Sequence, residues 1–263
     1  MPAPFARSLV MDSDAAAYCA RSGATDRAAI NAFVRGVKSL GLWQNMVCWP
    51  LRSSQNAGFG DTVHSLGGLG TFNGTRVNAP AWGADGVTFV NVSSQYITTN
   101  SSINLSTADT LIAAVAKFTD SGIRDLVGTG TVGGSTGFLL AQGSATSLAA
   151  QAQGTVTFFP SINHGSTQGS FEAYAALNSN SGTTVTVSFG ASTNSSTQPT
   201  HVVNSGNHPF IIGHSSLVAS GSRYMQGDVA LALLIRGAQA TMANWGSLTT
   251  LYKSTLGTRL GLP

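Results

Sequence analysis

Short stretches typical of β-strands, separated by turn residues, fill the chain from about residue 43 to residue 235. Residues 183–189 alternate polar and apolar side chains with a period of two, as a half-buried strand does. Residues 111–118 are apolar enough for a central strand that is buried on both faces. Because no helical periodicity separates these stretches, the pattern predicts an all-β fold, a two-sheet antiparallel sandwich. Further strands are expected at residues 87–92, 138–140, 155–159, 171–177, 210–212 and 228–235.

Two turn-rich stretches lie within this pattern. Asn73 and Gly74 form the commonest two-residue signal of a β-hairpin, so a hairpin turn is expected there. Residues 191–207 are rich in Ser, Thr, Asn and Gly. They are interpreted either as a long loop or as a weak edge hairpin, and the sequence leaves both readings open.

Helical patterns flank the strands at both ends of the chain. Residues 12–43 are predicted to be helical, with Ser13 as the first N-cap and an apolar stripe that includes Phe33 and Val37. Near the C-terminus, Thr241 is predicted to cap a short helix. One face of that helix carries Trp245, Leu248, Tyr252 and Leu256. The sandwich is therefore expected to begin with helices and to end with one.

The surface of this chain must be unusually neutral. Charged residues make up 9% of the sequence, far below the usual quarter, and the 31 glycines with Ser, Thr, Asn and Gln have to cover the outside. A neutral surface keeps molecules apart poorly, which suits a protein packed against copies of itself or a larger particle. The simpler alternative is a neutral β protein with no such role.

Charge and hydropathy also exclude two classes of partner. The 13 basic and 10 acidic residues are scattered, whereas nucleic-acid binding needs clustered Lys and Arg. The longest dense apolar run, residues 229–235, is too short to span a bilayer, and the N-terminus has no signal-peptide pattern. Cys19 and Cys48 are too few for a disulfide framework and are predicted to be buried free thiols. We therefore predict neither a nucleic-acid partner nor a membrane segment.

The acidic residues argue against catalysis. Retaining glycosidases place two carboxylates about 5–5.5 Å apart, but Glu172 is the sole glutamate and has no acid within four residues. The five histidines lack metal-ligand spacing, and the isolated aspartates do not suggest a calcium site. The prediction is a binding protein that is not an enzyme, with no catalytic residues, metal or cofactor.

A carbohydrate-binding face would need aromatic platforms beside amide and hydroxyl groups. Trp82, Tyr96 and Tyr174 are the candidate glycan-binding residues, and Tyr224 is a further aromatic of the same kind. At strand positions, however, an aromatic side chain more often belongs to the core. Both interpretations of these residues remain open at this point.

Three stretches resemble the concanavalin A-like lectin/glucanase family, the laminin-G type of jelly roll. The first combines residues 82–89 with 96–99, the second is 109–118, and the third is 224–238 followed by a short helix that reaches residue 252. The resemblance covers roughly residues 70–256. It implies a concanavalin A-like jelly roll, and it says almost nothing about a ligand because these are packing motifs.

The N-terminal stretch has a second resemblance. Residues 12–18 and 27–43 are similar to the helical segment that precedes laminin-G-like domains in virion proteins of tailed bacteriophages. This implies a phage virion structural protein, made in the host cytoplasm and carried on the capsid surface or in a tail fibre. The implied partners are the major capsid protein or other virion proteins, and copies of itself, with a trimer as one expectation.

These inferences combine into a two-part chain. Residues 1–43 are predicted to be an arm and helical docking segment, and residues 44–263 the sandwich with its C-terminal helix. Virion docking is assigned to Pro4, Phe5, Arg7, Phe33 and Val37. The expected role is capsid decoration (a cement or head-surface protein). The alternative is a tail-fibre module that recognises host-surface glycans.

Overall fold

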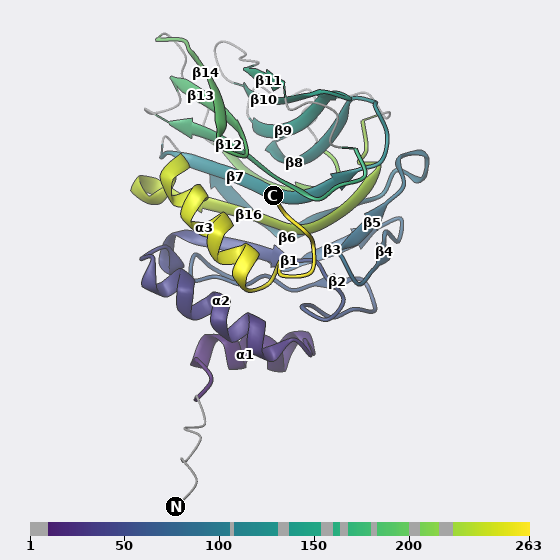
Figure 1. Ribbon diagram of the computed structural model, residues 1–263, viewed down its shortest axis with the longest axis vertical. Helices are drawn as coiled ribbons and strands as arrows, with labels where there is room; N and C mark the ends of the chain where they lie inside the picture. The colour runs from purple at the N-terminus through teal and green to yellow at the C-terminus, as the bar shows by residue number, and fades with distance from the viewer. Residues whose placement is uncertain are drawn as a thin grey trace, which may run out of the picture.

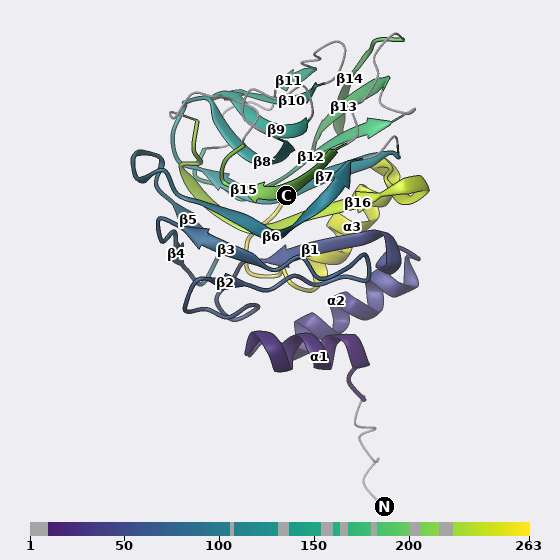
Figure 2. The same ribbon diagram turned by 180° about the vertical axis from the view of Figure 1, so that it is seen from behind.

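The structure is a computed structural model that describes residues 10–105, 108–130, 137–153, 160–163, 168–179, 183–199, 206–215 and 223–263. Its elements form three layers: a layer of helices, a first β-sheet and a second β-sheet (Figures 1 and 2). Pro4, Phe5 and Arg7 lie outside the described residues, so their docking role stays a prediction. The expected strand at residues 155–159 lies mostly outside them as well.

The first sheet is the middle layer. Its strand order is β14-β13-β12-β7-β16-β5-β4, and β1 pairs with β16 beside β5. All of its strand pairs are antiparallel. The strands are β1 (Met46–Pro50), β4 (Ala81–Trp82), β5 (Val87–Phe89), β7 (Thr110–Phe118), β12 (Glu172–Ser179), β13 (Thr184–Phe189), β14 (Ser192–Thr197) and β16 (Gly227–Arg236).

The second sheet forms the outer β layer. Its order is β11-β10-β9-β8-β15-β6-β3-β2, again with antiparallel pairs. The strands are β2 (Thr62–Val63), β3 (Gly74–Val77), β6 (Tyr96–Leu105), β8 (Arg124–Gly130), β9 (Gly137–Ser144), β10 (Ser147–Gln153), β11 (Ser161–Asn163) and β15 (Gly206–Ile212). The predicted two-sheet antiparallel sandwich is confirmed.

The first sheet has a hydrophobic core on each of its faces. Along β7, Ile112 and Ala114 point into the core between the two sheets, whereas Leu111 and Ala113 point into a core shared with the helices. Successive side chains of a strand point to opposite faces, so a strand between two cores must be apolar at nearly every position. This explains the continuous apolar run that predicted a doubly buried strand at residues 111–118.

The helices cover the outer face of the first sheet (Figure 1). They are α1 (Ser13–Ser22), α2 (Arg27–Ser39) and α3 (Met242–Ser254). The described residues also form the short 3₁₀ helices η1 (Trp43–Asn45), η2 (Asn91–Ser93) and η4 (Gly237–Gln239). On α3, Trp245, Leu248 and Tyr252 are buried against the sheet, and the Thr241 hydroxyl caps the helix as predicted. No helix within the described ranges is long and apolar enough to cross a membrane.

The apolar stripe of α2 is already used inside the molecule. Phe33 and Val37 are fully buried, in the same core as Trp245 of α3 and Leu233 of β16. Their assignment to virion docking is therefore wrong, because neither side chain is available to a partner. Residues on both sides of position 43 share this core, so α1 and α2 are part of the folded body rather than a separate docking segment.

The first helix begins one residue earlier than expected. Asp12, not Ser13, is the N-cap, and its carboxylate accepts the backbone N–H of Asp14 at 3.0 Å. The same carboxylate pairs with Lys38 at 2.7 Å, near the end of α2. An aspartate cap that also binds a lysine fastens the two helices together, which a serine could not do.

The two turn-rich stretches have different outcomes. Gly74 opens β3, whose hairpin partner β2 ends at Val63, so a ten-residue loop replaces the expected Asn-Gly turn. Within that loop the side-chain oxygen of Asn73 accepts the N–H of Ser65 at 3.0 Å. Residues 191–207 contain β14, which is exposed and pairs with β13. The weak edge hairpin is thus the correct reading of that stretch.

The two cysteines are free thiols, as predicted. Cys19 on α1 and Cys48 on β1 are both buried in the core beneath the helices. Burial raises the pKa of both thiols, because a thiolate would be poorly solvated there. Both therefore act as small apolar core residues.

Candidate functional site

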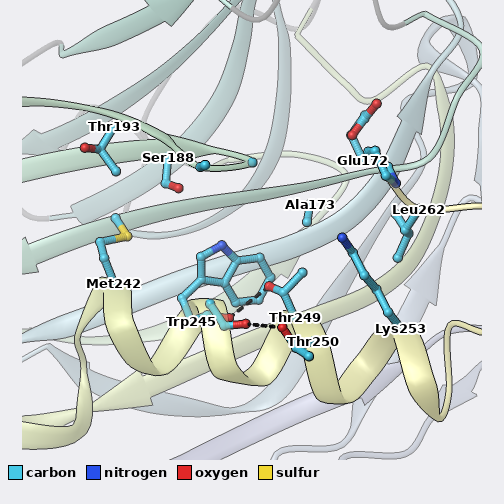
Figure 3. A pocket seen from close by; sticks show the side chains of 14 residues that line it. Glu172, Ala173, Ser188, Thr193, Met242, Trp245, Thr249, Thr250, Lys253 and Leu262 are labelled. Carbon is cyan, nitrogen blue, oxygen red and sulfur yellow. Dashed lines mark hydrogen bonds between the residues drawn. The ribbon is translucent and has the colours of Figure 1, made fainter.

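A groove of about 680 Å³ lies between α3 and one end of the first sheet (Figure 3). One wall is α3, and the other is formed by the start of β12 and by β13, β14 and the turn between them. The last residues of the chain, Leu262 and Pro263, close part of it. Its volume falls within the range of roughly 300–1,000 Å³ that is usual for sites of small ligands.

A single stripe of α3 forms the helical wall. Met242, Trp245, Thr249 and Lys253 follow one another at spacings of three or four residues, which places them along one side of the helix. At 1.5 Å per residue, the stripe from Met242 to Lys253 is about 16 Å long. Trp245 is 4% exposed, and the neighbouring Leu248 anchors the helix to the sheet. The wall is therefore held rigidly, by the same contacts that bury the opposite side of α3.

Threonine hydroxyls present hydrogen-bond acceptors to the groove. The hydroxyl of Thr249 donates to the backbone carbonyl of Trp245 at 2.9 Å, and that of Thr250 donates to the carbonyl of Gly246 at 3.1 Å. Because the single proton of each hydroxyl is used within the helix, the lone pairs of the oxygen remain for a ligand.

A cation stands at one end of the groove. Lys253 extends from α3 toward the start of β12, but the carboxylate of Glu172 there points away from α3 (Figure 3). Glu172 pairs with Ala116 in the strand register and so lies on the face turned to the second sheet. Burial raises the pKa of Glu172, and the positive charge of Lys253 opposes this effect. Among the described residues, the two groups form neither a direct ion pair nor a hydrogen bond, although Glu172 is only 9% exposed. A ligand in the groove that accepts hydrogen bonds can therefore bind the Lys253 ammonium without meeting the carboxylate.

Trp245 adds a further donor. Its indole nitrogen points across the groove toward the strands (Figure 3). Within the described part of the chain, the indole N–H has no hydrogen-bond acceptor. A polar ligand in the groove can therefore gain hydrogen bonds from this N–H and from Lys253. Met242 and Ala173 supply apolar surface beside them.

Tyr174, one of the predicted glycan-binding residues, belongs to the core. It is fully buried between the two sheets, and its ring centroid lies 5.6 Å from that of Phe118 and 5.8 Å from that of Phe189. The prediction for Tyr174 is wrong, because an even-numbered residue of β12 faces the second sheet and not the solvent.

Trp82 lies at the edge of the first sheet, on β4, and is half-buried. Its indole N–H donates to the carbonyl of Gly60 at 3.1 Å, and the guanidinium of Arg76 lies 5.5 Å from its ring. The ring contacts of Tyr96 are with other residues, so the structure does not assemble Trp82 and Tyr96 into one platform.

Tyr96 does belong to an aromatic cluster on the second sheet. Its ring lies 5.9 Å from His214 and 6.2 Å from Tyr224, and the last two stack at 4.0 Å. Behind them Asp125 is fully buried and pairs with Arg223 at 2.7 Å. Beside this ion pair, the Nδ1 atom of His214 and the Nε atom of Arg223 are buried without a hydrogen-bond partner among the described residues.

The charges beneath this cluster are strongly perturbed. Burial raises the pKa of Asp125 to about 6, even though Arg223 acts in the opposite direction. Burial and Arg223 together lower the pKa of His214 to about 4. No group of three or more His, Cys, Asp or Glu side chains able to hold a metal ion occurs within the residues that the structure describes.

Sequence reasoning missed the groove. It placed Trp245 on the buried face of a helix and gave this residue no role in binding. The one available signal was the Met, Trp, Thr and Lys stripe of residues 242–253. That signal became informative once the fold had placed the β13–β14 turn beside it.

No protein-family model matches the sequence, and no curated protein matches it. Part of the structure is similar to the CBM40 of Ruminococcus gnavus IT-sialidase bound to α2,3 sialyllactose, with 10% identity, a TM-score of 0.42, and 49% of this chain and 75% of that chain covered. It is also similar to the NanB sialidase of Streptococcus pneumoniae (12% identity, TM-score 0.42, 53% of this chain and 23% of that chain). The mouse laminin α1 chain, domains LG4-5, is similar at 12% identity and a TM-score of 0.40, covering 51% of this chain and 39% of that chain.

These similarities extend over about half of this chain. The class of the protein is defined by its own architecture: an all-β sandwich of two antiparallel sheets with a helical layer on one face.

Proposed function

We propose that this protein binds carbohydrate in the groove between α3 and the first sheet, without cleaving it. The observation that carries the proposal is the row of polar groups that α3 presents to the groove. Lys253 and the Trp245 indole offer donors, and the hydroxyl oxygen of Thr249 offers an acceptor. Sugar hydroxyls both donate and accept, so one ligand can bind all three.

Most of the groove lining is uncharged. Lys253 is the one described lining residue whose charged group points into the groove, since the Glu172 carboxylate lies on the other face of β12 (Figure 3). The apolar side chains of Met242 and Trp245 suit the C–H surface of a pyranose ring, which lies beside its hydroxyls. A neutral saccharide combines both properties.

The acid content of the groove supports binding without cleavage. Glycoside hydrolysis requires two carboxyl groups, about 5–5.5 Å or 6.5–9.5 Å apart. Glu172 is the one carboxylate side chain among the described residues that line the groove. It is also the one glutamate of the whole sequence.

Replacing Lys253 tests this proposal. The substitution Lys253→Met keeps most of the apolar stem but removes the donor, and we expect a loss of affinity of about tenfold or more, as for a charge-assisted hydrogen bond. A glycan array identifies the saccharide, and titration calorimetry measures its affinity. Arg35→Met is the matched control, because Arg35 is an exposed cation of α2 away from the groove.

Two results would count against carbohydrate binding in the groove. One is a wild-type protein that binds no glycan on the array. The other is a folded Lys253→Met variant that binds the glycan as tightly as the wild type does.

We also propose that the protein is displayed on a tailed-phage particle. The support is the resemblance of residues 12–18 and 27–43 to the helical segment of phage virion proteins. Since Phe33 and Val37 are buried, contact with the major capsid protein or another virion protein would fall to the arm that contains Pro4, Phe5 and Arg7. Copies of this chain, a trimer for example, could share such a contact.

The number of copies per purified particle tests the display proposal. Quantitative mass spectrometry of virions should find many copies if the protein decorates the capsid, and few if it belongs to a tail fibre. Its absence from purified particles would contradict both forms of the proposal.

A further inference from the structure

A row of hydroxyl groups on β13 and β14 continues the groove. The row begins with Ser188 and Thr193, which lie directly opposite each other in the strand register and line the groove. Figure 3 shows both of them above Met242, at the end away from Lys253. The groove therefore opens, at this end, onto the outer face of the two strands.

Two further hydroxyl pairs follow along the same face. The Oγ atoms of Thr186 and Ser195 are 2.7 Å apart, and the Oγ1 atoms of Thr184 and Thr197 are 3.2 Å apart. The intervening Val185 and Val187 are buried in the core between the sheets. Because side chains alternate between faces, the three pairs must all lie on the outer face.

This hydroxyl ladder is uncharged and exposed along β14. Thr193, Ser195 and Thr197 are exposed, Thr184 and Thr186 are half-exposed, and Ser188 is buried. In the pair of Thr186 and Ser195 the bond between the hydroxyls uses one proton, so the pair can still donate as well as accept. At two residues per step, successive pairs lie about 6.6 Å apart, and the ladder is about 13 Å long.

We infer that the ligand is a neutral, linear polysaccharide that runs from the Lys253 end of the groove, past Trp245, and out along the hydroxyl ladder. This inference rests on the proposed carbohydrate binding. The α3 stripe and the ladder together offer a track of about 30 Å, far longer than one sugar ring. A monosaccharide or disaccharide would leave most of these groups unused.

The chemistry of the ladder favours a neutral sugar chain over other extended ligands. Among the described residues of β13 and β14, the outer face has no charged side chain that would select an acidic polymer, and no apolar side chain that would select an apolar peptide. A polypeptide strand could instead pair with the backbone edge of β14. Such pairing would depend little on the hydroxyls of the outer face.

The dependence of affinity on chain length tests this inference. A glycan array that carries neutral linear chains of different lengths, followed by titration calorimetry, should show affinity that rises with length until the track is filled. In the double variant Thr186→Val and Ser195→Ala, we expect about a tenfold loss of affinity for long chains, as two lost hydrogen bonds imply, and no change for disaccharides. Ser196→Ala is the matched control, because Ser196 lies on the opposite face of β14.

The possible outcomes separate this inference from the proposed function. If disaccharides bind as tightly as long chains and the double variant changes nothing, the ladder is not part of the site, although the groove still binds sugar. If no chain of any length binds, the proposed function itself fails. Binding of an extended peptide that survives the double variant would replace the inference with strand pairing at β14.

Discussion

Asp125 and His214 lie 4.0 Å apart, and their protonation is shifted in opposite directions. Burial raises the pKa of Asp125 to about 6, so the folded state holds this proton more tightly than the unfolded chain does. Burial lowers the pKa of His214 to about 4, so the folded state holds that proton less tightly. As the pH rises from about 4 to 6, the effect of Asp125 makes the folded state less stable. Over nearly the same range, the effect of His214 makes the folded state more stable.

These opposed effects predict a pH dependence that appears when either residue is replaced. His214→Gln leaves Asp125 alone, so the variant should lose stability relative to wild type as the pH rises from 4 to 6. Asp125→Asn leaves His214 alone and should gain stability over that range. Each slope can reach about 1.4 kcal/mol per pH unit, the value for one proton. Urea unfolding at a series of pH values measures the slope of the free energy of unfolding against pH. The same slope in both variants would contradict the two opposed pKa shifts.

For single residues, the sequence predicted where strands lie but not which way their side chains point. A strand was predicted at residues 171–177, which include Tyr174, and the family resemblance implied one at residues 96–99. The pattern did not reveal that Tyr174 faces the second sheet whereas Tyr96 reaches an aromatic cluster. Which face of a strand is covered depends on the neighbouring layer, and that layer is distant in sequence.

At the scale of elements, amphipathic helices were predicted correctly and their partners were not. The apolar stripe of α2 indicates that something covers Phe33 and Val37, and a virion partner was one reading. In the structure α3 and the first sheet cover them. Periodicity identifies the face of a helix that is buried, but it cannot identify the surface that buries it.

The groove, too, depends on how separate elements pack together. Its two walls, α3 and the β13–β14 pair, are separated by more than forty residues of sequence. Each was recognisable by itself: α3 by its cap and apolar face, and β14 as a weak edge hairpin. The hydroxyl ladder also explains why β14 looked like a loop, since its outward side chains carry no apolar signal.

At the scale of the whole molecule, the sandwich could be predicted because many weak signals agree. Short strands, turn residues and a doubly buried central strand all favour two antiparallel sheets. The helical layer makes the first sheet the middle of three layers, and this arrangement creates the groove at its edge (Figure 1). The sequence pattern predicts the helices and strands that make up the layers. How the layers lie against one another depends on packing between residues that are distant in sequence.

The most direct test of carbohydrate binding in the groove is a titration followed by NMR. The chain has four tryptophans, so a ¹⁵N-labelled sample gives four indole N–H signals, and Trp245→Phe assigns the one from the groove. When the array-identified glycan is added, we expect the Trp245 signal to shift together with backbone signals of β13 and β14. A glycan that instead shifts the signals around Tyr96, His214 and Tyr224, and leaves Trp245 unchanged, would contradict the account.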